Sequence, residues 1–248
     1  MDIPGSNIGE EELEYTGIEP TDVMTGDRCQ SRFLYYQLKM SIRKAEKIDI
    51  IVSFLMESGV RMLLKDLKSA LNRGAKVRIL TGNYLGITQP SALYLIKKEL
   101  GRHVDLRFYN DKTRSFHPKS YIFHYGELSE IYIGSSNISK SALTSGIEWN
   151  YRFNNKLDKK NFQIFFRTFE ELFFHHSIVV DDAELKRYSK HWHKPAVARD
   201  LAKYDSEGED AKVSPLFHPR GAQIEALYAL EDSRAEGAVK GLVQAATG

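Results

Sequence analysis

Apolar residues recur at spacings of three and four in five stretches of the chain, the period of one helix face. The clearest stretch is 56–71, and Gly74 follows it as a helix stop. This pattern predicts helices over residues 28–47, 56–71, 90–100, 159–175 and 222–233. The helix at 159–175 carries an aromatic stripe, which we expect to form core or a subunit interface. The stripe consists of Phe162, Phe165, Phe166, Phe169, Leu172 and Phe173.

Short runs rich in β-branched and aromatic residues lie between these helices and predict strands. The predicted strands are 48–54, 76–80, 104–109, 120–124, 130–133, 147–153 and 238–243. Two strand–helix units come first, followed by a cluster of strands and a helix. This order predicts an α/β fold in which helices flank a mixed β-sheet. Residues 201–214 are polar and lack periodicity, so they are predicted to form a linker.

The charge is unevenly distributed along the chain. Residues 1–27 carry eight acidic side chains and no Lys or Arg, which predicts an acidic tail. The other residues carry a net charge of +10, and between Arg28 and Lys119 there are 19 Lys or Arg against seven Asp or Glu. Such an excess suits a polyanionic partner such as DNA, although a solvated basic surface is an equally ordinary explanation.

Composition limits the cellular setting. The only cysteine is Cys29, which excludes intrachain disulfides and cysteine-rich zinc modules. No stretch approaches the ~18 uncharged apolar residues of a membrane span, and residues 1–27 do not resemble a signal or transit peptide. We therefore expect a cytoplasmic protein that has no membrane partner.

The residues that suit catalysis are gathered between positions 116 and 148. His117-Pro118-Lys119 precedes one predicted strand, Gly134-Ser135-Ser136-Asn137 ends the next, and Glu148 follows. An imidazole nucleophile, a cation and neutral hydrogen-bond donors suit attack on a phosphodiester. Glu148 could hold the ring of His117 in one tautomer through its second nitrogen.

This pattern resembles the phospholipase D superfamily, whose signature is His-x-Lys-x4-Asp followed by Gly-Ser-x-Asn. The resemblance spans roughly residues 28–180 and is strongest to the single-motif nuclease branch, in which an acidic residue about eleven positions after the Asn supports the histidine. It implies the superfamily fold and a phosphohistidine intermediate at His117. It further implies that Lys119, Ser135 and Asn137 bind phosphoryl oxygens and that Glu148 orients His117.

One position departs from the signature, because His124 stands where the Asp is expected. In the superfamily that acid is mainly structural, and the nuclease branch often lacks it. The departure therefore weakens a lipase interpretation more than a nuclease one.

The mechanism implied by the resemblance needs a second histidine to protonate the leaving oxygen, yet His117-Pro118-Lys119 is the only His-x-Lys in the sequence. We therefore expect a homodimer with a two-fold axis through one composite site. No metal is expected at this site, because Lys and His supply the positive charge.

Two other features have less specific interpretations. His175, His176, His191 and His193 could form a metal site, but surface or interface positions are more common for such residues. The loop 81–86 follows a strand and precedes a helix, so it either lines the phosphate site or is a plain connection.

The C-terminal segment resembles the start of a superfamily 2 helicase core. Gln223 matches the adenine-reading glutamine, and Ala245 to Gly248 resembles the first half of a phosphate-binding loop of the type Ala-x4-Gly-Lys-Thr, whose Gly-Lys-Ser/Thr is absent. ATP and Mg²⁺ are expected only for such a helicase domain, in cis in a longer protein. This architecture resembles prokaryotic restriction enzymes.

The sequence thus predicts an acidic tail (1–27), a phospholipase D-like nuclease domain (28–200), a linker (201–214) and the start of a helicase ATPase domain (215–248). The leading functional hypothesis is a metal-independent DNA endonuclease. Two alternatives stay open: a hydrolase of phospholipids or other phosphodiesters, and a non-enzymatic module for DNA binding and dimerisation.

Overall fold

Eight strands form one mixed β-sheet in the computed structural model, which describes residues 20–27, 32–82, 86–111, 113–193 and 221–240. The strands are β1 (Val23–Met24), β2 (Lys47–Val52), β3 (Lys76–Thr81), β4 (Val104–Tyr109), β5 (Lys119–Tyr125), β6 (Leu128–Gly134), β7 (Asn150–Asn154) and β8 (Ser177–Val179). Their order across the sheet is β1-β7-β6-β5-β2-β3-β4-β8. The three strands β2, β3 and β4 run parallel, and every other neighbouring pair is antiparallel. The predicted mixed sheet is confirmed.

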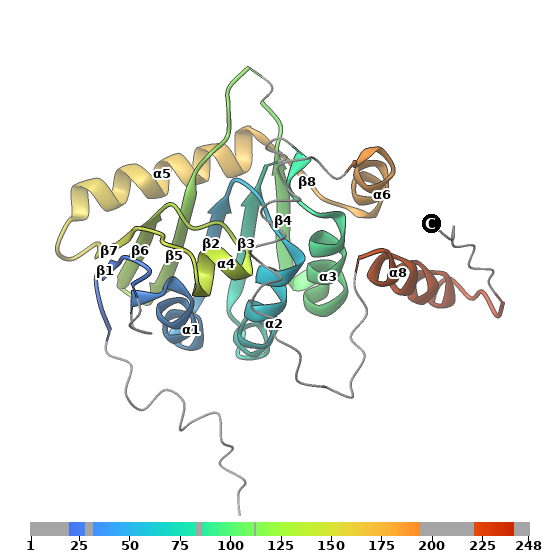
Figure 1. Cartoon of the computed structure of the whole chain (residues 1–248), viewed down its shortest axis with the longest axis horizontal. Helices are drawn as coiled ribbons and strands as arrows, with labels where there is room; N and C mark the ends of the chain where they lie inside the picture. The colour runs from blue at the N-terminus through green and yellow to red at the C-terminus, as the bar shows by residue number, and fades with distance from the viewer. Residues whose placement is uncertain (1–19, 28–31, 83–85, 112, 194–220, 241–248) are drawn as a thin grey trace, which may run out of the picture.

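Helices cover both faces of this sheet (Figure 1). They are α1 (Leu34–Lys44), α2 (Glu57–Asn72), α3 (Pro90–Leu100), the 3-10 turn η4 (Gly101–His103), α4 (Lys140–Thr144), α5 (Lys159–His175), α6 (Asp182–His191) and α8 (Ala222–Ala235). Figure 1 shows α1, α2 and α3 on one face and α5 alone across the other. Among the helices of the described residues, none combines the length and the apolar character needed to cross a bilayer.

The core has two layers because successive side chains of a strand point to opposite faces. On β2, Ile50 and Val52 belong to the cluster beneath α1, α2 and α3, whereas Ile51 belongs to the cluster beneath α5. Each of these three side chains is at most 5% exposed. The strand is therefore buried on both faces, as its unbroken apolar run predicted.

The aromatic stripe of α5 forms much of the second layer. Phe162, Phe169 and Phe173 are buried against the sheet, which confirms the interpretation of the stripe as core for these residues. Phe165 is 39% exposed and lies at the margin of the layer, tilted against Phe153.

Several sequence expectations need correction. The segment predicted as an acidic tail contains β1, which pairs with β7 at the edge of the sheet. The elements α4, α6 and β8 were not predicted, and residues 238–240 lie in no strand although they begin a predicted one. The predicted linker 201–214 and residues 241–248 lie outside the described residues.

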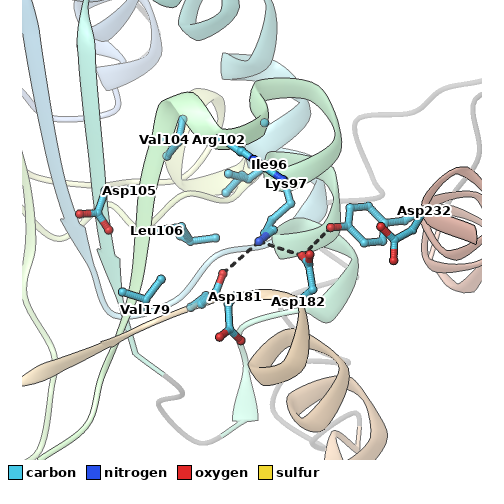
Figure 2. A pocket seen from close by; sticks show the side chains of 13 residues that line it. Ile96, Lys97, Arg102, Val104, Asp105, Leu106, Val179, Asp181, Asp182 and Asp232 are labelled. Atoms are coloured by element: carbon cyan, nitrogen blue, oxygen red, sulfur yellow. Dashed lines mark hydrogen bonds and ion pairs between the residues drawn. The ribbon is translucent and has the colours of Figure 1, made fainter. Parts of the chain in front are cut away.

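The helix α8 packs against the rest of the structure through α3 and α6. Ile224 is 1% exposed and belongs to the main core cluster. Tyr228 donates a hydrogen bond to Asp182 at 2.6 Å, and Lys97 pairs with the same carboxylate at 2.9 Å (Figure 2). A pocket of about 300 Å³ lies between these elements. The segment predicted to begin a helicase thus shares its core with the nuclease-like part.

Candidate active site

The two sequence segments singled out for catalysis meet at one end of the sheet. The last residue of β2, Val52, pairs with Lys119 at the start of β5, and Gly134 at the end of β6 pairs with Asn150 at the start of β7. Since β5 and β6 are themselves neighbours, the turn after Gly134 lies beside the segment that carries His117 and Lys119. Sheet register therefore brings together residues that are far apart in the sequence.

His117 and Lys119 are in direct contact. The Lys119 Nζ lies 2.7 Å from Nδ1 of His117, 3.4 Å from Nε2 and 3.0 Å from the His117 carbonyl oxygen. His117 is exposed, whereas Lys119 is 8% exposed. An ammonium group can only donate, so the Nδ1 that faces it accepts and the imidazole is neutral.

The electrostatics of the pair favour the neutral ring. Partial desolvation of the ring and then the positive charge of Lys119 lower the pKa of His117 below its ordinary value. Burial also lowers the pKa of Lys119, and the negative charge of Glu148 opposes this shift. A neutral imidazole keeps the lone pair that a nucleophile needs, so this environment suits His117 for attack near neutral pH.

Ser135 and Glu148 form the next part of the site. The Ser135 hydroxyl donates to the Glu148 carboxylate, and the backbone N–H of Trp149 donates to the Ser135 oxygen at 3.1 Å. Backbone pairing reinforces this arrangement, because the Ser135 N–H donates to the Trp149 carbonyl, also at 3.1 Å. Glu148 thus lies next to Ser135, and its charge reaches Lys119. Its predicted role in orienting His117 stays a prediction.

The tight turn after β6 requires its glycine. A Cβ atom at Gly134 would lie 2.1 Å from the Trp149 carbonyl oxygen, which no larger residue tolerates. The following Ser136 is buried, and its hydroxyl donates to the Ala142 carbonyl while accepting from the Asn150 amide. These two hydrogen bonds of the buried Ser136 fix the turn, and Ser135 lies on its exposed side.

Asn137 is 5% exposed, and its side-chain oxygen accepts a hydrogen bond from the Phe54 N–H at 3.2 Å. The amide oxygen is therefore occupied, and the amide nitrogen is the group left to donate. A neighbouring residue that the sequence did not indicate is Ser53, whose hydroxyl contacts Lys119. The sequence around Ser53, a serine directly after a strand, contains no motif that indicates this contact.

His124, at the position of the signature's Asp, lies within a buried polar network. Its Nε2 is 3.2 Å from Asp49 of β2, and its Nδ1 is 2.9 Å from the Ser129 hydroxyl. Although burial raises the pKa of Asp49, hydrogen bonds from Arg78 and His124 outweigh it and hold that pKa below its ordinary value. At the β5 position where the signature has an acid, this chain has His124, which contacts an acid on β2.

The four histidines considered for a metal site do not gather. His176 lies 3.5 Å from Glu171, which also approaches His175, whereas His191 and His193 hydrogen-bond to backbone carbonyls near α6. Among the described residues, no group of three or more His, Cys, Asp or Glu could hold a metal ion.

The loop 81–86 is only partly described, since residues 83–85 lie outside the described ranges. Gly82 packs tightly behind the site. A Cβ atom there would lie 2.6 Å from the ring of Phe116, which precedes His117, and 3.2 Å from the Ser53 carbonyl. The described part of this loop therefore supports the wall of the site.

Gln223 lies in the first turn of α8. Residues 245–248, which were predicted to bind phosphate with it, lie outside the described residues. The predicted adenine-binding role of Gln223 stays a prediction.

The sheet, its two helical layers and the single His-x-Lys site define an α/β domain of the phospholipase D type. A family model described as "Cardiolipin synthase, PLD-like domain" matches residues 38–176, more than half of the chain. The chain belongs to this phospholipase D-like family, whose members process phosphodiesters. The matched range includes all five residues predicted to act in catalysis.

Three solved structures are similar to this chain at low sequence identity. Nuc from Salmonella typhimurium, a phospholipase D family member, is 20% identical, with a TM-score of 0.50 over 66% of this chain and 100% of its own. NucT from Helicobacter pylori is 18% identical over 63% of this chain and 96% of its own, with a TM-score of 0.49. Phosphatidylserine synthase from Haemophilus influenzae is 13% identical over 75% of this chain and 44% of its own, with a TM-score of 0.49. No curated protein matches the sequence.

Proposed function

We propose that this protein is a DNA phosphodiesterase that works without a metal ion through a phosphohistidine at His117. The observation that carries the proposal is the contact between the imidazole of His117 and the Lys119 ammonium. Ser135 and Asn137 lie at the same end of the sheet. The Asn137 amide nitrogen is a neutral donor for a phosphoryl oxygen, and the Ser135 hydroxyl becomes one when it turns from Glu148 to the substrate. The basic body of the chain, with a net charge of +10 outside residues 1–27, favours DNA over a lipid as the substrate.

In the proposed reaction, a phosphate oxygen binds the Lys119 ammonium in place of the imidazole, which frees the ring for attack. A ring nitrogen of His117 forms a bond to phosphorus, and the bond from phosphorus to the leaving oxygen breaks. The partner subunit's His117 acts in its imidazolium form, gives its proton to the leaving oxygen and becomes neutral. Water then attacks the phosphohistidine and gives its proton back to that second imidazole, which regenerates both histidines.

The test is plasmid cleavage in excess EDTA by the wild-type chain, by His117→Ala and by a control variant, His103→Ala, whose imidazole lies at the other end of the sheet. We expect the wild type and the control to cleave and His117→Ala to lose at least 10³-fold in rate. Cleavage abolished by EDTA would contradict the metal-independent mechanism. Equal nicking by His117→Ala would favour a non-enzymatic DNA-binding and dimerisation module, and headgroup release from phospholipid without DNA cleavage would favour a lipase.

The homodimer in this proposal has a separate test. If one composite site uses both copies of His117, a dimer of one wild-type and one His117→Ala chain is inactive. After the two chains are mixed and refolded together, activity should fall as the square of the wild-type fraction. A linear decrease would show that each chain acts independently and would remove the dimer from the mechanism.

We also propose that the domain is the nuclease module of an ATP-dependent restriction helicase. This part of the proposal depends on Gln223 and on the sequence of residues 245–248. The coding sequence at the genomic locus tests it directly. One further residue followed by Gly-Lys-Ser or Gly-Lys-Thr after Gly248 would complete the phosphate-binding loop, and any other continuation would contradict the helicase assignment.

A further inference from the structure

Ser53 and Phe54, the two residues that follow β2, contact side chains from both catalytic segments. The Lys119 ammonium donates to the Ser53 hydroxyl at 3.2 Å, and the backbone N–H of Phe54 donates to Asn137 at 3.2 Å. Ser53 is 0% exposed and Phe54 is 8% exposed, so neither contact competes with bulk water. One dipeptide therefore holds a cation from the start of β5 and an amide from the turn after β6.

The direction of the Ser53 hydroxyl is fixed by its second hydrogen bond. Its hydrogen points to the Pro118 carbonyl oxygen at 3.2 Å, so a lone pair of the same oxygen faces Lys119. Both partners of Ser53 belong to the His117-Pro118-Lys119 segment. The sheet places them there, because Val52 pairs with Lys119 in the antiparallel register of β2 and β5.

The three hydrogens of the Lys119 ammonium match three acceptors. They are the His117 ring at 2.7 Å, the His117 carbonyl at 3.0 Å and the Ser53 hydroxyl at 3.2 Å. Two of these acceptors belong to His117 itself, and the ring is released when substrate binds in the proposed reaction. Ser53 is the acceptor from outside the motif that keeps the ammonium in place after that release.

We propose that Ser53 is a positioning residue that fixes the ammonium of Lys119 against the phosphoryl group during the reaction. This inference rests on the proposed function for its catalytic consequence. The hydrogen bond by which Ser53 holds Lys119 does not depend on which substrate binds. Ser53 itself does not bind the substrate. Its hydroxyl is already hydrogen-bonded to Pro118 and Lys119, so it acts on the phosphate only through Lys119.

The test compares Ser53→Ala with a matched control on the adjacent strand. Ser120→Ala removes a buried hydroxyl next to Lys119 that has no hydrogen-bond partner among the described residues. We expect Ser53→Ala to lower kcat roughly tenfold with little change in KM, because a hydrogen bond to a charged group is lost while the substrate still meets Lys119. Ser120→Ala should cleave DNA at the wild-type rate, and Ser53→Thr, which restores the hydroxyl, should recover most of the loss.

A second measurement separates positioning from simple folding damage and from failure of the proposed function. The pKa of His117 is followed by NMR titration of its ring in the wild type, Ser53→Ala and Ser120→Ala. If Ser53 holds Lys119 against the imidazole, Ser53→Ala raises the pKa of His117 towards its ordinary value and Ser120→Ala leaves it unchanged.

An unchanged kcat together with an unchanged His117 pKa in folded Ser53→Ala would overturn the inference. Failure of Ser53→Thr to recover activity while Ser120→Ala loses as much as Ser53→Ala would also overturn it. If the wild type cleaved no DNA, the proposed function would fail, and the NMR titration alone would decide whether Ser53 holds Lys119.

Discussion

At the scale of single residues, Lys119 combines two tasks that chemistry usually assigns to separate groups. In the proposed reaction it is a cation for phosphoryl oxygens, and its charge, after burial, also lowers the pKa of His117. Both effects depend on the two-residue spacing that lets the buried side chain fold back onto the imidazole at 2.7 Å. Removal of the ammonium should therefore change the pH dependence as well as the rate.

The variant Lys119→Met tests this link. In the wild type, His117 is neutral above its lowered pKa, so we expect activity to fall as the pH drops through that value. Without the neighbouring charge, the pKa of His117 should rise, so the acid limb of the kcat/KM profile should move to higher pH. The rate at the optimum should fall by roughly 10²–10³-fold, the cost of one lost oxyanion donor.

A pH–rate profile of single-turnover DNA cleavage measures both effects. Lys68→Met removes an exposed lysine that pairs with Glu99 and should leave both the profile and the rate unchanged. An acid limb that stays in place in Lys119→Met would contradict the electrostatic role of Lys119.

Site residues could be predicted from the sequence only where their partners lie close to them along the chain. The two motifs are short and local, so the spacing of His117 and Lys119 could be read directly from the sequence. Ser53 lies 66 residues from Lys119, and Asp49 lies 75 residues from His124. Only the pairing of β2 with β5 brings these partners together, and nothing in the local sequence specifies that pairing.

At the scale of elements, β2 organises the molecule because it lies between β3 and β5 in the middle of the sheet. Its Asp49 is fully buried and accepts two hydrogen bonds from Arg78 of β3, at 2.6 and 2.8 Å. Arg78 also pairs with Glu170 of α5 and lies over the ring of Phe169. One carboxylate thus links two strands and, through Arg78, the helix that covers the second face.

The substitution Asp49→Ala tests this network. It leaves the Arg78 guanidinium without its closest buried partner, and we expect a loss of about 3–5 kcal/mol in the free energy of unfolding. Urea denaturation followed by circular dichroism measures the change. Glu127→Ala, which removes the partner of the exposed ion pair with Lys156, should cost at most about 0.5 kcal/mol. Equal losses in the two variants would show that burial adds nothing to the Asp49 network.

Elements that the sequence did not reveal are short or lie at the sheet edge. The helix α4 has five residues and β8 has three, so neither completes a recognisable hydrophobic period. The helix α6 buries only Leu185 and Tyr188, too few apolar positions for a clear stripe. The long amphipathic helices and the buried central strands were predicted because several turns or residues repeat the same pattern.

At the scale of the whole molecule, α8 connects the C-terminal segment to the catalytic fold. Besides Ile224, it uses a tilted ring contact between Tyr228 and Tyr94 of α3, with 5.0 Å between centroids, and an ion pair between Glu231 and Lys98 at 3.0 Å. The Gly221 N–H also donates to Glu57 in the first turn of α2, at 3.0 Å. These contacts make α8 part of the same folded unit.

Weakening of this docking should be measurable. Ile224→Ala removes a fully buried side chain, and losses of about 2–5 kcal/mol are typical of such changes. We expect the backbone amides of 222–235 to exchange at least tenfold faster in hydrogen–deuterium exchange, while those of β2 change little. Val239→Ala, at a position 96% exposed, serves as the control. Unchanged exchange in α8 would show that Ile224 does not hold the helix.

The position of β2 also has a consequence for the synthesis of the chain. One edge of the strand can pair with β3 soon after both are made, but its other edge waits for β5, which begins about 67 residues after Val52. At ~5–20 residues per second, the interval is roughly 3–13 s, during which an apolar strand keeps an unpaired edge. The central strand that later supports His117 and Lys119 is therefore open to mispairing with other nascent chains until the ribosome has delivered its partner.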